Sequence, residues 1–234
     1  MSKRIRDIQI LEDQSESRGP KEGFLQLSRY LIRNLYEDGS ESEAYACDLI
    51  SRRHIDAVTI LLYEQLPDGG HRVGLRENLR PPVYLRSRNP KVLFHEEPPY
   101  TTLLETVAGV IENTDLADAE GESDLETVLR HRAAEECWEE VGIRVDLSAI
   151  EDLGAACFPT PGIGDEKVYF KAVRCRLDLA SPPQGDGSVM EEVGGLVILD
   201  LDEAIAACRS GRIADMKTEI ALVRLRDKLA EGPQ

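Results

Sequence analysis

Residues 57–63 read Ala-Val-Thr-Ile-Leu-Leu-Tyr, an almost continuous run of apolar and β-branched residues. A strand with one solvated face alternates apolar and polar residues, whereas a strand covered on both faces is apolar throughout. The run therefore predicts a central strand that is buried on both sides. The rest of the chain has to supply the neighbouring strands and the layers that cover them.

Other segments have the composition of short strands and, later in the chain, of helices. Strands are expected at Arg72–Leu75, Leu103–Val107, Val168–Leu177 and Leu196–Leu199, and late helices at about residues 202–209 and 216–229. Many short strands with few, late helices are typical of the α+β class, with helices packed on a mixed sheet. Residues 56–234 are expected to form this domain.

The first 55 residues are expected to form a separate tail and a small β-hairpin lobe. Apart from Ile8 and Leu11, residues 1–22 are polar and are predicted to fray. Two apolar runs follow at Leu27–Tyr36 and Tyr45–Ile50, with Asp38-Gly39 between them. An Asp-Gly pair between such runs is a strong hairpin signal.

The chain carries 28 Lys and Arg against 44 Asp and Glu, a net charge of −16. This charge repels phosphate backbones and argues against a general nucleic-acid binder, although a bound cation can reverse the field at one small site. No apolar stretch approaches the roughly 18 residues of a membrane span, and the start lacks the apolar core of a secretory signal. The five cysteines are dispersed and form no Cys-x-x-Cys pair, which argues against structural zinc and a disulfide framework. These features predict a cytoplasmic protein.

The most informative segment is the acidic stretch 134–143, Ala-Glu-Glu-Cys-Trp-Glu-Glu-Val-Gly-Ile. Ser123 to Glu126 match a Ser-x-x-Glu capping box, and the helix that it opens is expected to end at Val141, before Gly142. At about 100° per residue, four glutamates share one arc of this helix. They are Glu135, Glu136, Glu139 and Glu140. The adjoining arc is apolar and comprises Ala133, Ala134, Cys137, Trp138 and Val141.

Two interpretations of the acidic arc stay open from the residues alone. A run of charges is most often a solvated face, and like charges at i and i+4 cost only a few tenths of a kcal/mol each. Alternatively, carboxylates at i and i+4 converge on a hard cation such as Mg²⁺, which removes their repulsion. The acids lie in the C-terminal half of the helix, where the helix dipole disfavours them, and this conflict favours a functional role.

Glu136 to Ile143 resembles the second half of the Nudix box, Arg-Glu-U-x-Glu-Glu-x-Gly-U, in which U is a bulky aliphatic or small apolar residue. Three further segments resemble the ADP-ribose and nucleotide-sugar pyrophosphatase branch of that family: Glu105–Gly109, Thr160–Lys167 and Gly211–Thr218. The resemblance covers residues 58–199 and implies a Nudix-type α/β/α sandwich with a mixed sheet. It also implies that the small N-terminal β lobe joins two copies in an intertwined homodimer.

The chain departs from the family pattern in front of the acidic stretch. If Gly109 is the box glycine, about twelve residues are inserted before the position of the box arginine, and the acidic loop 110–122 accounts for much of this insertion. The arginine position itself holds Glu135. The sequence leaves the role of the inserted loop open.

The first box glutamate also has no clear counterpart. Glu122 lies too far upstream, and Glu126 is one place out of register. The supporting Glu–Arg pair of the family is therefore missing, or it is rebuilt with Arg130 or Arg132.

By this resemblance, the protein hydrolyses the diphosphate bond of ADP-ribose or another nucleoside diphosphate sugar, giving a nucleoside monophosphate and a sugar phosphate. The reaction needs charge neutralised on the phosphate oxygens and a water placed for in-line attack. Glu136 and Glu140 are expected to bind Mg²⁺ directly, with Mn²⁺ as the alternative ion. Glu139 completes the coordination or acts through water, and the carbonyl of Ala108 contributes from a strand end.

Glu166 is the expected general base, because related pyrophosphatases carry a catalytic or metal-assisting glutamate on the corresponding loop. Without the box, Glu166 would be an ordinary acidic turn residue, and Glu139 remains the alternative base. Arg80 matches an arginine of the family, and its planar fork suits diphosphate oxygens. Composition alone would make Arg80 a surface residue. Gly109 and Arg52 are the further candidates for substrate binding.

Two other functions stay open. The substrate could be another nucleotide, such as a dinucleoside polyphosphate, although the branch-like C-terminal segment argues against it. A non-catalytic sensor that binds a nucleotide sugar is a function of a different class. The replaced box arginine favours the sensor, and the retained glutamates argue against it. The sequence does not fix the nucleobase, the sugar or the number of metal ions.

Overall fold

The structure is a computed structural model that describes residues 5–13, 24–112, 115, 124–182 and 194–232. These residues fall into two compact units. The first comprises the chain up to residue 55 together with Phe158–Lys167, and the second comprises Asp56–Cys157 and the chain from Val168 onward. Segment 158–167 thus belongs with the N-terminal strands, from which it is distant in sequence.

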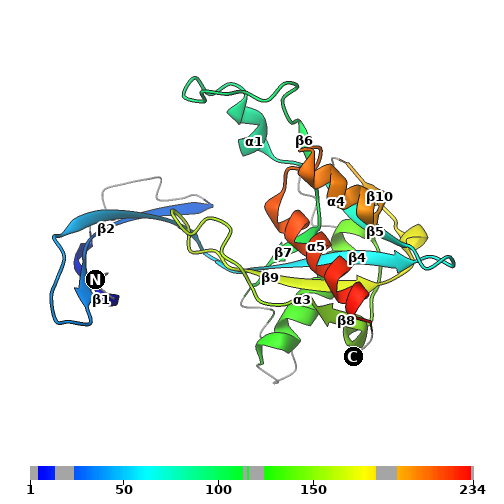
Figure 1. The fold of residues 1–234 in the computed structure, drawn as a ribbon, viewed down its shortest axis with the longest axis horizontal. Coiled ribbons are helices and arrows are strands. Elements are labelled where there is room, and N and C mark those ends of the chain that lie inside the picture. Colours follow the sequence, from blue (N-terminus) through cyan, green and yellow to red (C-terminus); the bar gives the residue numbers. More distant parts are fainter. Residues whose placement is uncertain (1–4, 14–23, 113–114, 116–123, 183–193, 233–234) are drawn as a thin grey trace. The chain divides into compact units, whose positions relative to one another are not determined.

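The first unit is an antiparallel sheet with the strand order β1 (Ile5–Asp13), β2 (Leu25–Tyr36), β3 (Tyr45–Arg52) (Figure 1). β2 and β3 form the predicted hairpin, and Gly39 in their connection has the positive φ, 82°, that a tight turn favours. The expectation of a frayed N-terminus is wrong for residues 5–13, because this segment pairs with β2. Among the described side chains of this unit, Ile32 is the one buried hydrophobic residue. The described sheet therefore has almost no core of its own.

The second unit is built on a mixed seven-stranded sheet. Its main path runs β10–β5–β4–β9–β8, with β6 beside β5 and β7 beside β4. The strands are β4 (Ala57–Gln65), β5 (His71–Leu79), β6 (Thr102–Glu105), β7 (Val107–Val110), β8 (Ile150–Asp152), β9 (Val168–Arg174) and β10 (Leu196–Asp200). β4 and β9 are parallel, and the other pairs are antiparallel.

Helices cover both faces of this sheet. α4 (Leu201–Arg209) and α5 (Met216–Glu231) lie over one face (Figure 1), and α3 (Leu125–Val141) packs on the other. The shorter elements are α1 (Pro81–Arg86), η2 (Leu147–Ala149) and η3 (Leu177–Leu179). None of the helices in the described ranges has the length and apolar content of a membrane span. The predicted α+β class and α/β/α layering are confirmed.

β4 confirms the predicted central strand and explains its continuous apolar sequence. Its first seven residues are all buried. Leu61 and Tyr63 enter the core beneath α4 and α5, whereas Ile60 and Leu62 enter the core beneath α3. Alternate residues of a strand face opposite sides, so burial on both sides requires an apolar residue at nearly every position. Each fully buried leucine or isoleucine contributes about 1.5–3 kcal/mol relative to an exposed one.

The single strand predicted at Leu103–Val107 is two strands, because the chain changes partner at Thr106. β6 pairs with β5, and β7 pairs with β4. At the change, the backbone N–H of Thr106 donates to Oγ1 of Thr218 at 2.9 Å. Ala108 and Gly109 consequently lie inside β7 and not after a strand end.

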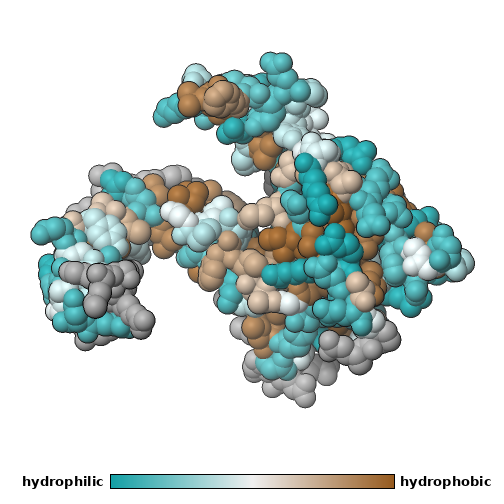
Figure 2. All heavy atoms as spheres, in the orientation of Figure 1, coloured by the Kyte–Doolittle hydropathy of each residue, from teal (hydrophilic) through white to brown (hydrophobic). Residues whose placement is uncertain are grey.

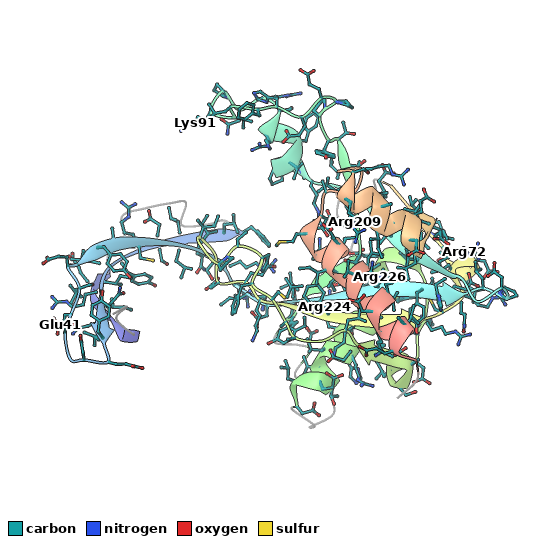
Figure 3. All side chains as sticks on the ribbon, in the orientation of Figure 1. Glu41, Arg72, Lys91, Arg209, Arg224 and Arg226 are labelled. Atoms are coloured by element: carbon teal, nitrogen blue, oxygen red, sulfur yellow. The ribbon has the colours of Figure 1, made fainter. Side chains whose placement is uncertain are left out.

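The segment between β5 and β6 projects from the second unit (Figure 1). From residue 81 to residue 101 no side chain is buried. Leu93 and Phe94 are 87% and 85% exposed and give the segment an apolar tip (Figure 2). Lys91 lies at the same end (Figure 3). Tyr100 ties the segment back to the unit by donating to the carbonyl of Gly211 at 2.6 Å.

Candidate active site

α3 carries the acidic residues. Its C-terminal end lies where the sequence predicts it, and its N-cap is one residue later than predicted. The N-cap is Asp124 and not Ser123, which lies outside the described residues. The Asp124 carboxylate accepts from the backbone N–H of Thr127 at 3.0 Å and from its hydroxyl at 2.8 Å. The helix ends as predicted before Gly142, which adopts the left-handed conformation with a φ of 64°.

The predicted division of α3 into an apolar and an acidic arc is confirmed. The fully buried members of the apolar arc are Ala133, Cys137 and Val141. On the acidic arc, Glu136 is also buried, and the side chain of Glu140 is only 15% exposed. The side chains of Glu135 and Glu139 are 45% and 43% exposed. A face that serves only solvation keeps its carboxylates in water, so the burial of Glu136 favours a functional arc.

Glu136 reaches the backbone of β7 at Gly109. A methyl group built on Gly109 would lie 1.5 Å from Oε1 of Glu136, far inside any contact that two atoms tolerate. Only a glycine leaves room for this carboxylate. The close backbone approach expected at Gly109 is therefore present, and the group that approaches is a carboxylate of the acidic arc.

The carbonyl of Ala108 faces away from β4. The N–H of Ile111 donates to the carbonyl of Asp56 at 2.9 Å, and bonded pairs alternate with non-bonded pairs along an antiparallel ladder. Ala108 lies three residues before Ile111 along the chain, opposite Thr59, and therefore falls at a non-bonded position. At such a position the carbonyl points to the outer side of its strand. Although Ala108 lies within a strand, its carbonyl is thus directed outward, as a metal-ligating carbonyl must be.

Arg132 lies among the acidic residues. Its guanidinium donates to Glu136 and lies 3.2 Å from a carboxylate oxygen of Glu135 and 3.4 Å from one of Glu139. Burial lowers the pKa of Arg132, but the charges of Glu136 and Glu139 outweigh burial and raise it. Of the two arginines named from the sequence, Arg132 is the one beside the acidic arc.

Glu126 and Arg130 serve the other end of α3. The Glu126 carboxylate accepts from Arg130 at 2.8 Å and from Lys171 of β9 at 2.6 Å. Lys171 is 1% exposed, so these partners compensate a buried charge. The contact fixes the first turns of α3 on the sheet. Glu122, the other candidate for the first box glutamate, lies outside the described residues.

Arg76 of β5 is fully buried beneath the end of α3, and the sequence does not single it out. Its Nη1 donates to the backbone carbonyl of Glu140 at 2.6 Å, and its Nε lies 3.9 Å from Oε2 of the same residue. Carbonyls at a helix C-terminus carry the negative end of the dipole, so this arginine stabilises the last turn. Placed between Leu75 and Glu77, Arg76 has the pattern of a solvent-facing strand residue. Only the helix packed over it causes its burial.

Arg80 stands at the end of β5 and forms a bidentate ion pair with the buried Glu105. Nε and Nη2 of Arg80 lie 2.7 and 2.8 Å from the two carboxylate oxygens. Glu105 also accepts from Lys217 of α5, whose ammonium lies 3.0 Å from Asp215. The hydrogen bond to Glu105 raises the pKa of Arg80, and the charge of Glu140 adds to this rise.

Glu166 and Arg52 both belong to the first unit and form an ion pair with each other. Their segments are joined by backbone pairing, because the N–H of Ile50 donates to the carbonyl of Ile163 at 2.8 Å. The structure thus brings two of the predicted site residues together and groups them with the N-terminal strands. Their link to substrate stays a prediction.

The acidic arc has the donor chemistry of a site for a hard divalent cation. Glu136 and Glu140 stand one helical turn apart, Glu139 is exposed beside them, and the Ala108 carbonyl is directed outward. Carboxylate and carbonyl oxygens are the ligands that Mg²⁺ takes. Among the described residues, no three His, Cys, Asp or Glu side chains already enclose a metal-sized position. Side-chain rotation would be needed to bring these oxygens onto one ion, and the ligand set stays a prediction.

Other groups of the second unit do not share this chemistry. Burial raises the pKa of the Cys137 thiol well above its ordinary value, which makes it a packing residue and not a nucleophile. A cavity of about 1230 Å³ lies at the far end of β4 and has none of the α3 glutamates in its lining. Within it, Tyr63 donates to Glu151 at 2.8 Å and Lys228 pairs with Glu151 at 2.9 Å. Since Tyr63, Glu151 and Lys228 bind one another here and the cavity lacks the carboxylate arc, we place the candidate site at the acidic arc of α3.

Comparisons with known proteins bear on the family and the fold of the chain. No protein-family model matches the chain. The GDP-mannose pyrophosphatase of Yersinia enterocolitica serotype O:8 / biotype 1B is 30% identical over 199 residues, which are 85% of this chain and 86% of that protein. A crystal structure described as an ADP compounds hydrolase matches 99% of this chain and 99% of its own, with a TM-score of 0.61 and 15% identity. This structural likeness shows the fold alone.

Proposed function

The chain belongs to the Nudix hydrolase family, in its branch of ADP-ribose and nucleotide-sugar pyrophosphatases, and from this membership we propose that it hydrolyses the diphosphate bond of a nucleoside diphosphate sugar with Mg²⁺. The observation that supports the proposal most is the excess of carboxylates at the buried Glu136. Burial of a carboxylate is costly unless a cation compensates it, and Arg132 does so for Glu136. Three carboxylates surround the single guanidinium of Arg132, so negative charge remains in excess. A divalent cation would balance it.

The residues that would hold the ion are Ala108 through its carbonyl and Glu136, Glu139 and Glu140 through their carboxylates. When bound, Mg²⁺ neutralises charge on the diphosphate oxygens and makes water a stronger nucleophile. Gly109 allows Glu136 to lie against the backbone of β7. Because Gly109 lies directly against Glu136, we also place it beside the substrate.

Arg80 and Glu166 have the remaining two roles, phosphate binding and proton acceptance. Arg80 binds phosphate oxygens through the N–H groups that its pair with Glu105 does not use. Glu166 accepts a proton from the attacking water. As the water oxygen bonds to phosphorus, the bond between that phosphorus and the bridging oxygen breaks. Arg52 orients Glu166 through their ion pair and contributes positive charge for the substrate. The products are a nucleoside monophosphate and a sugar phosphate.

Incubation of the purified protein with ADP-ribose or GDP-mannose tests this function. We expect AMP or GMP in the presence of Mg²⁺ or Mn²⁺, and none with EDTA. Glu136→Gln should abolish the product, whereas Glu135→Gln, an exposed neighbour on the same arc, should retain most of it. If no nucleotide sugar yields a monophosphate but the protein binds one, the chain is a sensor. Cleavage of dinucleoside polyphosphates alone would assign the other substrate class.

The same panel separates the two general bases. Glu166→Gln should lower kcat by about 100-fold or more, because a general base contributes 10²–10⁴-fold. If Glu139→Gln has that effect and Glu166→Gln does not, the base is Glu139. Hydrolysis in ¹⁸O-labelled water identifies the phosphorus that is attacked, since only one of the two products then carries the label.

We also propose that the protein is a cytoplasmic homodimer. The exposed hydrophobic residues of the first unit are numerous for its size and include Phe24, Leu25, Leu27 and Tyr45. A three-stranded sheet with such residues uncovered needs a second surface to bury them, and a second copy of the chain offers one. All five cysteines are free, which suits a reducing compartment. Light scattering should give twice the chain mass of 26.1 kDa, and a monomer over the micromolar range would refute the dimer.

A further inference from the structure

Glu105 is a buried carboxylate that two cations from distant segments share. It ends β6 and is 1% exposed. Arg80, at the end of the neighbouring β5, donates to both of its oxygens at 2.7 and 2.8 Å. Lys217, in the first turn of α5, donates to Oε2. One carboxylate therefore joins a strand end to the start of a helix.

The charges of this cluster balance without a ligand. Burial raises the pKa of Glu105, but the hydrogen bond from Arg80 and the charge of Lys217 outweigh burial, so the pKa is lowered and Glu105 is ionised. Asp215 provides the second negative charge, 3.0 Å from Lys217, and caps α5 by accepting from the N–H of Thr218. Two carboxylates thus face two cations. Since the cluster has no net charge, Glu105 can assist anion binding only by orienting the guanidinium of Arg80.

The bonds to Glu105 use one edge of the Arg80 fork. They involve Nε and Nη2, so three of the five N–H groups lie outside the pair. The side chain of Arg80 is 44% exposed, whereas that of Glu105 is 2% exposed. Two parallel bonds to a fixed, buried carboxylate restrict rotation of the guanidinium plane. The remaining donors are consequently held in one direction.

The strand register connects this pair to the acidic arc. Glu105 stands directly opposite Arg76 in the β5–β6 pair. Arg76 donates to the backbone carbonyl of Glu140 at 2.6 Å. Opposed residues of an antiparallel pair project from the same face of a sheet. The β5–β6 pair therefore fixes the position of Arg76, which lies beneath α3, and that of Glu105, which binds Arg80.

We infer that Glu105 is a positioning residue, which orients Arg80 so that the outer N–H groups of the guanidinium meet the diphosphate of the substrate. The inference rests on the proposed function. Glu105 itself does not contact substrate, because it is buried and its oxygens are bound by Arg80 and Lys217.

Steady-state kinetics with ADP-ribose test the inference through the variant Glu105→Gln. An amide cannot accept both bonds of the guanidinium, so Arg80 loses its fixed direction. We expect KM to rise by about 10- to 100-fold, the worth of a charge-assisted bidentate bond, with kcat changed less than about threefold. If Glu105 acted only as a charge, its removal would attract the anionic substrate and lower KM. A lowered or unchanged KM would overturn the inference.

Glu77→Gln is the matched control. Glu77 lies on β5 near the same strand ends and accepts a hydrogen bond from Thr102 at 2.6 Å, but its partner is not Arg80. Its KM should stay within about twofold of wild type. An equal rise in KM for both variants would show a general effect of disturbing these strands and would contradict the positioning role.

Variants of Arg80 keep the test decisive if Glu105→Gln does not fold, which circular dichroism will show. Arg80→Lys keeps the charge but lacks the planar fork, so its KM should approach that of Arg80→Ala. A KM of Arg80→Lys within twofold of wild type would refute the inference. If Glu105→Gln folds, adding it to Arg80→Ala should change KM by less than about twofold, because both changes act on one contact.

Calorimetry with inorganic pyrophosphate in Mg²⁺ buffer separates failure of this inference from failure of the proposed function. If the wild type binds pyrophosphate but cleaves no nucleotide sugar, the proposed function fails. The positioning role then still predicts about tenfold weaker pyrophosphate binding for Glu105→Gln and Arg80→Lys, with Glu77→Gln unchanged. Equal binding by all these proteins would overturn it.

Discussion

Replacing Gly109 by alanine tests the contact on which the proposed metal site depends. The added methyl group would lie 1.5 Å from Oε1, 2.1 Å from Cδ and 2.5 Å from Cγ of Glu136. Ordinary contacts between such atoms begin near 3.5 Å, so the carboxylate has to withdraw by about 2 Å. Gly109 is not among the glycines with positive φ. The strain is therefore steric, and it falls on one glutamate side chain.

A displacement of this size should disable the site without unfolding the protein. Mg²⁺ takes its ligands at about 2.0–2.1 Å with a narrow tolerance, and a misplacement of about 1 Å can cost 100-fold in rate. We therefore expect Gly109→Ala to lower kcat/KM for ADP-ribose by at least about 100-fold and to weaken Mn²⁺ binding. The glutamate side chain is flexible and can yield, so the loss of stability should stay near 1–3 kcal/mol.

Three measurements check this reasoning: the rate with ADP-ribose, the dissociation constant of Mn²⁺ by electron paramagnetic resonance, and thermal unfolding. Gly195→Ala is the control, because a methyl group there would meet no atom within 4 Å. It should match the wild type in all three. If Gly109→Ala binds Mn²⁺ and turns over like the wild type, the Glu136 carboxylate does not hold the ion where we place it.

The remaining predictions concern single side chains. Glu140→Gln should abolish turnover and weaken Mn²⁺ binding while the circular dichroism spectrum is unchanged, and wild-type activity would remove Glu140 from the ligand set. Arg80→Ala should raise KM for ADP-ribose by about 10- to 100-fold with a smaller change in kcat, whereas Arg86→Ala, an exposed residue paired with Glu96, should leave both unchanged. The folded-state pKa of Glu105 lies below its ordinary 4.5, so its ion pairs stabilise the fold above that pH and are lost as the pH falls through the lowered value. The difference in unfolding free energy between wild type and Glu105→Gln should shrink below about pH 4.5, and a constant difference from pH 7 to 3 would contradict this.

The parts of the fold that the sequence predicts are those with a local cause. Continuous apolar residues at 57–63 indicate β4 because each face of that strand meets its own core. The spacing of the glutamates on α3 fixes their shared arc, because helical geometry depends only on position along the chain. The glycine at 142 marks the helix end for the same local reason.

Features that depend on pairing between distant segments could not be predicted in this way. β1 mixes apolar residues with charged ones, and it becomes a strand because β2 offers it an edge. The division at Thr106 exists because β5 and β4 lie side by side, and the chain crosses from one to the other. Glu166 is grouped with β3 by backbone bonds of its loop. The division at Thr106 and the placement of Glu166 leave no periodic trace in the residues, and the alternation in β1 is limited to residues 7–10.

The replaced box arginine shows how a local comparison can mislead. Position 135 holds glutamate, which by itself favoured a non-catalytic sensor. Arg132 lies four residues before Glu136 and seven before Glu139, so at about 100° per residue all three share one stripe of the helix. A residue at 135 stands about 100° from Glu136 and could not lie along that stripe as closely. Arg132 contacts both glutamates, so a guanidinium lies beside the acidic arc although position 135 is not arginine, and the replacement alone is a weaker argument for a sensor.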